Sequence, residues 1–589
     1  MKVNRDVVIV FAVFTLFVSS TTAWYFNPIV EEKTREVVTI IETPFVVLQS
    51  DYVYLGDDKI VLTLELENSA MTTQSTNIEV QALDSSGEII LDDGDVEMIQ
   101  NSIALGIPSG GKYLESFTFE KTELKTESDV FLIILWWDTA QGVFISGGGT
   151  SVTPKALIAY RSSDLGGPNY PKYRFYDLEW SAAQQINEPA DQEVRIVRSA
   201  WSTESSSTDN ALIVLMTDMG DIDAYNYDGF SWDHDRLGGV WESETGKGKG
   251  KDKGKGKSKD WETTRPFDFA YESLSGDAVL VYKDNGTDAS EDIVYRVWDG
   301  EGWSEPAYID DPAGRREYYW IGLASDPLTD QIAMIGVTGD GESNCWIWDG
   351  SSWGSHHRLS DSVTDVEYEV AHIAWEYTSG EALAAVANGK YVETAVYDGS
   401  WTDTGSFSLV TNPKKKTPEV NWVVLKPQNV EGSNRIMFMA LDGRKKLYTR
   451  LWEGSSWAGL PEQMDDKLQS ADTRCFDGDW MPSGTSFILF AGQDKTKQLS
   501  YKVWTPSGWN PSGSGSWSLY KGATKKQYWI QVRSNQVDDY PQVVVGIVDS
   551  SENLVLTSWD GASLQDQTVA STHSTRDYES FELAFSFPP

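Results

Sequence analysis

Apolar residues along most of the chain fall in short runs that are separated by turn-forming residues. Between positions 318 and 350, the runs 318–323, 331–337 and 345–348 are divided by an Asp-Pro turn and a Gly-Asp-Gly turn. Short runs of this kind, rich in aromatic and β-branched residues, indicate strands. The unit then ends at Asp349-Gly350, a pair that favours a tight hairpin because glycine accepts a positive φ. We therefore predict three or four antiparallel strands in about 50 residues.

This unit repeats down the chain, in most copies with an acidic residue at the turn and a tryptophan just after it. Successive turns are 49 to 55 residues apart, except for one interval of 71. A fixed period of this size predicts a solenoid or a β-propeller. The turn positions are Asp177, Asp228, Asp299, Asp349, Asp398, Glu453, Thr505 and Asp560, and the tryptophans are Trp180, Trp232, Trp303, Trp353, Trp401, Trp457 and Trp509.

The middle strand of each repeat distinguishes the propeller from a solenoid. Segments such as 211–216, 278–282 and 436–439 are almost continuously apolar, as expected of a strand buried on both faces. In a propeller, each middle strand lies between two neighbouring blades. We assign the repeated tryptophans a structural role, in which each ring covers the rim of a neighbouring blade.

The two ends of the repeat region predict how the ring closes. Residues 155–160 resemble a middle strand and 173–176 the strand after it, so this first unit lacks its first strand. The C-terminal segment 576–585 matches first strands such as 316–324. We predict an eight-bladed propeller over 152–589, in which the C-terminal strand completes the first blade and removes an exposed sheet edge.

The interval of 71 residues contains an insertion of glycine and lysine. Residues 246–259 include seven lysines and no apolar residue, a composition that predicts a flexible loop. It is either a solvated loop or a cationic tether for an acidic partner.

The N-terminus predicts export. A short basic start is followed by an apolar run at 7–18, small polar residues at 19–23 and an aromatic cluster at 24–26. Residues 1–30 are either a cleaved signal peptide or a signal anchor that crosses the membrane. In both cases the bulk of the chain lies outside: on the cell membrane as a single-pass protein, or secreted if the N-terminus is cleaved.

Residues 37–148 follow a different pattern, in which apolar and polar residues alternate. Segments 59–67 and 77–83 alternate clearly, and 130–137 is a central apolar strand. About seven such strands predict a β-sandwich. The order of strands and turns resembles the immunoglobulin-like modules that serve as spacers in microbial surface proteins.

The net charge argues against one class of partner, and the spacing of the two cysteines argues against a disulfide. The net charge of −41 argues against a nucleic-acid-binding protein and fits a soluble, self-repelling surface. Cys345 and Cys475 lie two repeats apart, too far to meet in neighbouring blades, so we predict two buried free thiols.

The sequence contains no pattern of catalytic, cofactor-binding or metal-ligating residues. The five histidines lack zinc-site spacing, and no Gly-x-Ser-x-Gly elbow is present. Acidic turns at 92–95 and 284–288 are candidates for structural calcium, with a plain solvated turn as the alternative. Asn285 begins an Asn-Gly-Thr glycosylation sequon.

The Asp-Gly-x-x-Trp turn resembles the Asp-boxes of sialidase-type propellers. Those boxes place one residue between Asp and Gly, whereas Asp299-Gly300 are adjacent here; in that family the box is structural. The repeat also resembles propeller lectins, and this resemblance implies sugar pockets between blades.

We therefore expect a membrane-tethered, extracellular binding or adhesion protein of the cell surface, whose propeller recognises a glycan or a protein and does not catalyse a reaction. A sialidase-like glycan hydrolase is one alternative and would place carboxylates and arginines together near the ring axis. A self-assembling subunit of a surface layer or filament is the other.

Overall fold

The computed structural model describes backbone strands between residues 45 and 146 and most of residues 156–585. The gaps in the second range are 164–166, 178, 187, 191, 203–209, 229–230, 241–263, 284–292, 312–316, 411–418, 482–484, 521–524, 535–542, 560–563 and 566. The chain forms two compact units, 1–153 and 154–589. Every regular element within the described residues is a β-strand.

The first unit contains three antiparallel sheets, in the orders β1-β2-β7, β5-β4-β8-β9 and β3-β6. The strands are β1 (Phe45–Tyr54), β2 (Lys59–Asn68), β3 (Gln74–Ser75), β4 (Asn77–Leu83), β5 (Ile99–Ser102), β6 (Gly106–Ile107), β7 (Lys112–Glu120), β8 (Val130–Trp137) and β9 (Ala140–Ser146). Only their backbone is described, so the immunoglobulin-like sandwich stays a prediction. The expected anchor at 1–30 lies outside the described residues, and the described residues include no helix suited to cross a membrane.

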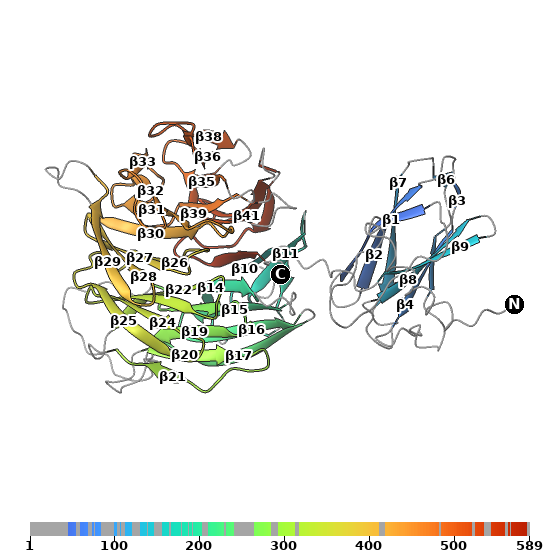
Figure 1. Ribbon diagram of the computed structural model, residues 1–589, viewed down its shortest axis with the longest axis horizontal. Coiled ribbons are helices and arrows are strands. Elements are labelled where there is room, and N and C mark those ends of the chain that lie inside the picture. Colours follow the sequence, from blue (N-terminus) through green and yellow to red (C-terminus); the bar gives the residue numbers. More distant parts are fainter. Residues whose placement is uncertain are drawn as a thin grey trace. The chain divides into compact units, whose positions relative to one another are not determined.

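The second unit is an eight-bladed β-propeller, as predicted (Figure 1). Blade 1 comprises β10 (Ala156–Tyr160), β11 (Lys172–Asp177), β12 (Glu179–Trp180), β13 (Gln184–Gln185) and β43 (Phe581–Phe585). Blade 2 comprises β14 (Val194–Trp201), β15 (Asn210–Thr217), β16 (Asp221–Asp228) and β17 (Trp232–Gly239). Blade 3 comprises β18 (Phe267–Tyr271), β19 (Ala278–Lys283), β20 (Ile293–Trp298) and β21 (Ala307–Ile309). Blade 4 comprises β22 (Tyr318–Ser325), β23 (Ile332–Thr338), β24 (Ser343–Trp348) and β25 (Trp353–Ser360).

The remaining blades have the same antiparallel order. Blade 5 comprises β26 (Ala371–Trp375), β27 (Ala382–Asn388), β28 (Tyr391–Tyr397) and β29 (Trp401–Ser408). Blade 6 comprises β30 (Val420–Pro427), β31 (Arg435–Asp442), β32 (Leu447–Glu453) and β33 (Glu462–Asp465). Blade 7 comprises β34 (Phe476–Trp480), β35 (Phe487–Gly492), β36 (Leu499–Thr505), β37 (Gly508–Asn510) and β38 (Ser518–Tyr520). Blade 8 comprises β39 (Gln527–Ser534), β40 (Val543–Asp549), β41 (Leu554–Trp559) and β42 (Thr568–Ser571).

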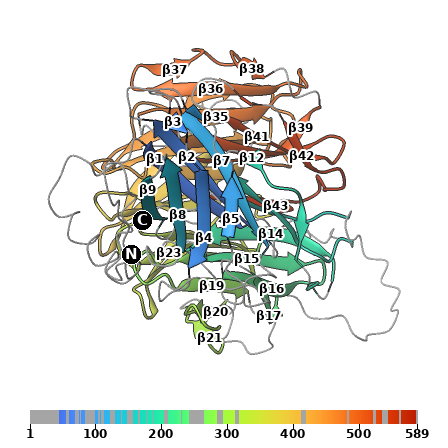
Figure 2. The same cartoon turned by 90° about the vertical axis from the view of Figure 1, so that its right-hand side faces the viewer.

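The C-terminal strand closes the ring, which confirms the split blade. β43 pairs antiparallel with β10, so that Phe581 lies opposite Tyr160 and Phe585 opposite Ala156. The last described strand, β43, accordingly lies beside β10 (Figure 1), and it also contacts β14 of the next blade (Figure 2). The strand is shorter than the predicted 576–585, because residues 576–580 form the loop that leads into it.

The middle strands are buried on both faces, as their composition predicted. All seven residues of β23 and all seven of β40 are buried. The first strands form the inner wall of the ring, because each contacts the first strands of its neighbours. The hydrophobic core therefore consists of layers between adjacent blades, with the first strands around the axis.

The first strands alternate between two forms around the ring, a feature that the 50-residue period did not reveal. In the odd-numbered blades β43, β18, β26 and β34 have five residues each, and in the even-numbered blades β14, β22, β30 and β39 have eight. Each of the four long strands carries a register shift after its first residue. A bulge of this type bends the strand and redirects the side chain that follows it. The third residue of the strand, directly after the bulge, is tryptophan in three of the four strands: Trp320, Trp422 and Trp529.

The repeated acidic turns hold the hairpin between the third and fourth strands of a blade. The Oδ1 atom of Asp299 accepts hydrogen bonds from the backbone N–H of Glu301 and Gly302 at 3.0 and 2.9 Å. These hydrogen bonds hold the pKa of Asp299 below its usual range. Gly300 adopts a φ of +88°, which is why glycine follows the aspartate.

The same turn recurs in other blades with small differences. Asp349 accepts from the backbone N–H of Ser351 and Ser352, and Asp398 accepts from Ser400. Glu453 forms its turn through the main chain, by donation from its N–H to the carbonyl of Ser456. The side chains of Asp177, Asp228 and Asp560 lie outside the described residues, as does Asn285.

The repeated tryptophans pack within the outer hairpins and between blades. Trp303 lies 5.7 Å from Trp298 across its turn, and Trp353 lies 5.7 Å from Trp348. Trp303 also packs on a cluster built from blades 2 and 3. The others lie opposite an aromatic residue in the same position: Trp180 opposite Tyr176, Trp232 opposite Tyr227, Trp401 opposite Tyr397, Trp457 opposite Trp452, and Trp509 opposite Trp504.

Both cysteines are free and buried, as the two-repeat spacing predicted. Burial raises the pKa of both thiols, to about 11 for Cys475. They therefore behave as small apolar core residues.

Candidate ligand pocket near the ring axis

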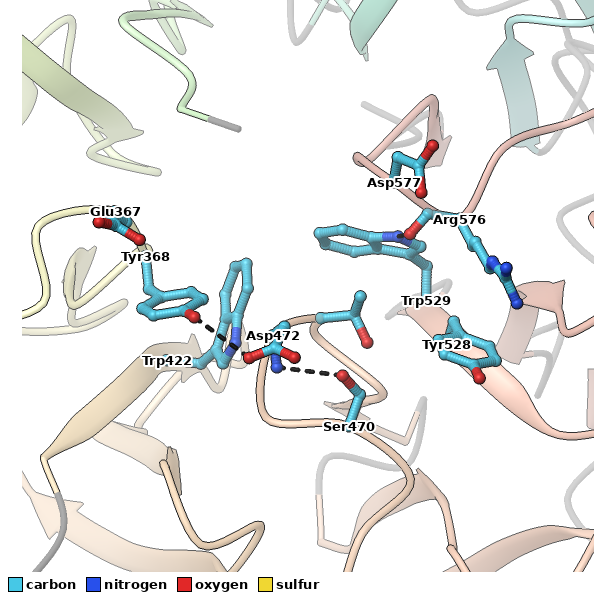
Figure 3. Close-up of a pocket in the computed structure, with 10 residues that line it drawn as sticks. Glu367, Tyr368, Trp422, Ser470, Asp472, Tyr528, Trp529, Arg576 and Asp577 are labelled. Atoms are coloured by element: carbon cyan, nitrogen blue, oxygen red, sulfur yellow. Dashed lines mark hydrogen bonds between the residues drawn. The ribbon is translucent and has the colours of Figure 1, made fainter. Parts of the chain in front are cut away.

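A pocket of about 300 Å³ opens on the face where the fourth strand of one blade connects to the first strand of the next. Its walls come from the beginnings of β30 and β39 and from the loops that lead into β26, β34 and β43. Because these elements surround the axis, the pocket lies near the mouth of the ring (Figure 3). The lining residues are Glu367, Tyr368, Trp422, Ser470, Asp472, Thr473, Tyr528, Trp529, Arg576 and Asp577.

Two bulge tryptophans, Trp422 of β30 and Trp529 of β39, form the inner part of the pocket. Their rings meet edge to face with centroids 5.6 Å apart and are almost fully buried. The Nε1–H of Trp422 donates to the carbonyl of Ala471 at 2.9 Å, and that of Trp529 donates to the carbonyl of Arg576 at 2.9 Å. Each indole thus ties the loop before the following first strand to the inner wall.

Trp320 of β22 repeats this arrangement two blades before Trp422. Its Nε1–H donates to the carbonyl of Val366 at 3.0 Å, and its ring lies 6.2 Å from that of Trp422. Three loops that form the pocket rim are therefore held in the same way by tryptophans of alternate blades. A site held by hydrogen bonds to rigid strands is suited to keep its shape before a ligand binds.

Two tyrosines add ring faces that are only half-buried. The hydroxyl of Tyr368 donates to Oδ1 of Asp472 at 3.1 Å, and its ring lies 5.9 Å from Trp422. Burial, followed by the charge of Asp472, raises the pKa of Tyr368 well above its usual range, so the hydroxyl stays a hydrogen-bond donor. The hydroxyl of Tyr528 accepts from Nε2 of Gln469 at 3.3 Å.

Thr473 lines the pocket, and its hydroxyl has no hydrogen-bond partner in the described part of the chain. The residue is 7% exposed, and its Oγ1 is buried. An unpaired buried hydroxyl costs roughly 1–3 kcal/mol. A ligand would recover this free energy if the side chain turned to present Oγ1 to the pocket, where the hydroxyl could form a hydrogen bond.

Three carboxylates lie around the opening. Glu367, Asp472 and Asp577 are exposed, and Figure 3 shows Glu367 beside Tyr368, Asp472 lower between the two tyrosines, and Asp577 above Trp529. Arg576 is the one cation of the lining set. Its guanidinium lies 5.5 Å from the Tyr528 ring centroid and 3.9 Å from Glu552.

Buried ion pairs join residues that come just before the first strands of the odd blades. Each odd blade has a charged residue three positions before the second residue of its first strand. These residues are Arg265 before β18, Glu369 before β26, Arg474 before β34 and Glu579 before β43. Cation and anion therefore alternate around the odd blades. Arg265 pairs with Glu369 at 2.6 Å, and Arg474 pairs with Glu579. Glu369 follows Tyr368 and Arg474 follows Thr473, so these pairs position the pocket floor.

A second layer of charge lies on the first strands themselves. Asp268, Asp477 and Glu582 occupy the second position of their odd-blade strands and pair with Arg198, Lys426 and Arg533 of even blades. Burial alone would raise the pKa of Asp477, yet Lys426, Arg474 and Arg533 together hold it below its usual value. His372 takes the same position in blade 5, and burial lowers its pKa to about 4.

None of the repeat-turn residues singled out in the sequence lines this pocket. The sequence nevertheless contains a pattern that marks the pocket, and it repeats once every four blades. Tyr-Trp-Ile occurs at 319–321 and again at 528–530, and an acidic residue followed by Tyr-Glu occurs at 367–369 and at 577–579. These pairs are half a ring apart, so an analysis in steps of one blade does not align them.

No model of a known protein family matches the chain, and no functionally curated protein matches its sequence. Its solved structural neighbours are lectin and sialidase-like β-propellers among others. The BP39L lectin from Burkholderia pseudomallei is 11% identical, with 64% of this chain and 98% of that chain covered and a TM-score of 0.41. A single-substitution mutant of the NanB sialidase from Streptococcus pneumoniae is 11% identical, with 84% and 92% covered and a TM-score of 0.32.

A periplasmic gluconolactonase from Pseudomonas aeruginosa is 9% identical, with 62% of this chain and 95% of that chain covered and a TM-score of 0.35. These scores concern the fold and carry no argument about the ligand.

Proposed function

We propose that this chain is a carbohydrate-binding protein that holds a sugar in the pocket near the ring axis. The observation that carries the proposal is the convergence of tyrosine and tryptophan rings with carboxylates and the unpaired Thr473 hydroxyl in one pocket. Sugars present apolar C–H faces and a rim of hydroxyl groups. Aromatic rings cover such faces, and carboxylate and hydroxyl oxygens pair with the hydroxyl groups.

The size of the pocket limits the part of the glycan that it takes. Its volume of about 300 Å³ is at the lower end of the roughly 300–1,000 Å³ range of small-molecule sites. One sugar ring fits a space of this size. The proposed ligand is therefore a terminal or single sugar residue, with the rest of the glycan outside the pocket.

The location of the protein belongs to the same proposal. The apolar run 7–18 and the aromatic cluster that follows it support a membrane-tethered chain with its bulk outside the cell. There the propeller would act in adhesion, by recognition of glycans on a partner cell or matrix.

A glycan hydrolase is the second candidate, because carboxylates and an arginine do meet on one face near the axis. Glu367, Asp472 and Asp577 supply the carboxylates and Arg576 supplies the cation. The pairing of Arg576 with Glu552 and its position over Tyr528 favour a structural role for this arginine over capture of a substrate carboxylate. Release of chromophore from a panel of aryl glycosides separates the two candidates.

The proposal is tested by a glycan array probed with the full chain in a detergent that carries no sugar headgroup. We expect binding to a small set of glycans that share a terminal residue. Tyr528→Ala, which removes a pocket wall, should abolish the signal. Tyr391→Ala is the matched control, since Tyr391 is 41% exposed on β28 and outside the pocket. Glycan binding that survives Tyr528→Ala would place the site elsewhere.

A further inference from the structure

We propose that the pocket selects a positively charged sugar, an amino sugar with a free ammonium group, over neutral and acidic sugars. This inference rests on the proposed carbohydrate-binding function and specifies its ligand class. The charges around the opening, the aromatic rings and the Thr473 hydroxyl support it.

The charge around the opening is negative. Glu367, Asp472 and Asp577 come from three different loops, and no described cation forms an ion pair with any of the three. Arg576, the one cation of the lining set, is offset by Glu552 at 3.9 Å. A sugar carboxylate would meet like charge at this opening, whereas an ammonium group would meet opposite charge.

The other groups of the pocket suit the same ligand. A cation is attracted to the faces of tyrosine and tryptophan rings, which Tyr368, Tyr528 and Trp422 supply. An ammonium group has three donors and no acceptor. The unpaired Oγ1 of Thr473 can accept from one of them, and the rim carboxylates from the others.

The arrangement does not suit a metal ion. Among the described residues, no group of three or more His, Cys, Asp or Glu side chains is placed to hold one. The three carboxylates stand at separate parts of the opening (Figure 3), so they would surround an organic cation without converging on a single point.

The test is a calorimetric titration of the full chain with the methyl glycosides of glucosamine, glucose and glucuronic acid. It is performed near pH 6, where an amine with a pKa of about 7.7 carries its proton. We expect the glucosamine glycoside to bind at least about tenfold more tightly than the glucose glycoside, and the glucuronic acid glycoside to bind most weakly. The preference should shrink at 1 M salt, because the carboxylates are exposed and salt screens exposed charges.

A charge-neutral variant identifies the groups responsible. The double variant Glu367→Gln/Asp577→Asn should lose most of the preference for the glucosamine glycoside over the glucose glycoside, measured as the ratio of the two affinities. Glu305→Gln is the matched control, since Glu305 is exposed and outside the pocket. An unchanged preference in the double variant would overturn the inference.

The outcomes for the inference and for the proposed function can be told apart. If the glucose glycoside binds as tightly as the glucosamine glycoside, charge selection is wrong and carbohydrate binding stands. If choline binds in the pocket and no sugar does, charge selection stands and the carbohydrate function is wrong. If neither choline nor any of the sugars binds, both are wrong.

Discussion

The indole N–H of Trp529 donates to the backbone carbonyl of Arg576 at 2.9 Å, and this hydrogen bond helps to join the bulged strand β39 to the loop that leads into the closing strand. The same loop carries Asp577 to the pocket and continues into β43. Ring closure and pocket geometry are therefore linked at one position.

Trp529→Phe tests this link, because it keeps an aromatic ring and removes the donor. The carbonyl of Arg576 would lose its partner in this partly buried contact, at a cost of about 0.5–1.5 kcal/mol. We expect a lower denaturation midpoint in urea and weaker binding of the pocket ligand. Trp401→Phe is the matched control: its N–H donates to Ser355 at 2.7 Å at an exposed site, where water replaces the lost bond, so the midpoint should barely change.

Removal of the closing strand should unfold the propeller. Phe581 and Leu583 are fully buried and Phe585 is 6% exposed. Burial of each side chain contributes roughly 1.5–3 kcal/mol, a total comparable with a net stability of about 5–15 kcal/mol. We expect a chain that ends at Ser580 to aggregate, as judged by size-exclusion chromatography and thermal denaturation. A truncated chain with an unchanged melting temperature would show that β43 does not close the ring.

The axial ion pair between Arg474 and Glu579 should show strong coupling. Arg474→Met leaves Glu579 buried without its charged partner, with the hydrogen bond from Gln531 still in place, which costs about 3–5 kcal/mol. The double variant Arg474→Met/Glu579→Gln removes both charges and should recover much of this loss. The measurement is a double-mutant cycle in urea. Additive effects of the two substitutions would mean that the pair does not interact.

Glu376 should give the protein a pH-dependent stability near neutrality. Burial raises the pKa of its carboxyl from 4.5 to about 7, although Ser379 and the indole of Trp452 donate to it. The folded chain therefore binds more protons than the unfolded chain between these values, so the free energy of unfolding falls as pH rises from 4.5 to 7. Glu376→Gln should flatten this slope in urea titrations across that range. A slope that the substitution does not change would assign the effect to other groups.

Most of the fold could be predicted from the sequence, because a propeller repeats its apolar pattern once per blade. The middle strands, the acidic turns and the split first blade were all marked by local residues such as Asp299 and by the match of the C-terminal segment to first strands. The two free cysteines followed from their spacing alone.

The pocket could not be predicted in the same way, because it depends on differences between blades. Trp422 and Trp529 look like ordinary core aromatics within one repeat, and only the bulge before each turns it toward the axis. Asp472 and Tyr368 lie 104 residues apart, and no pattern within one 50-residue unit joins them. The N-terminal predictions, the anchor at 1–30 and the immunoglobulin-like sandwich at 37–148, stay predictions.

The most direct measurement of the central claim is a calorimetric titration of the array-selected sugar into the full chain and its Thr473→Val variant. We expect the wild-type chain to bind the sugar. We also expect Thr473→Val to weaken binding by about tenfold, the effect of one lost hydrogen bond of roughly 1.4 kcal/mol, without a loss of folding stability, since the removed hydroxyl has no partner in the described protein. Thr402→Val, at an exposed position of β29, should bind as the wild type does. Equal affinity of Thr473→Val and wild type, or no sugar binding by the wild type, would contradict the account.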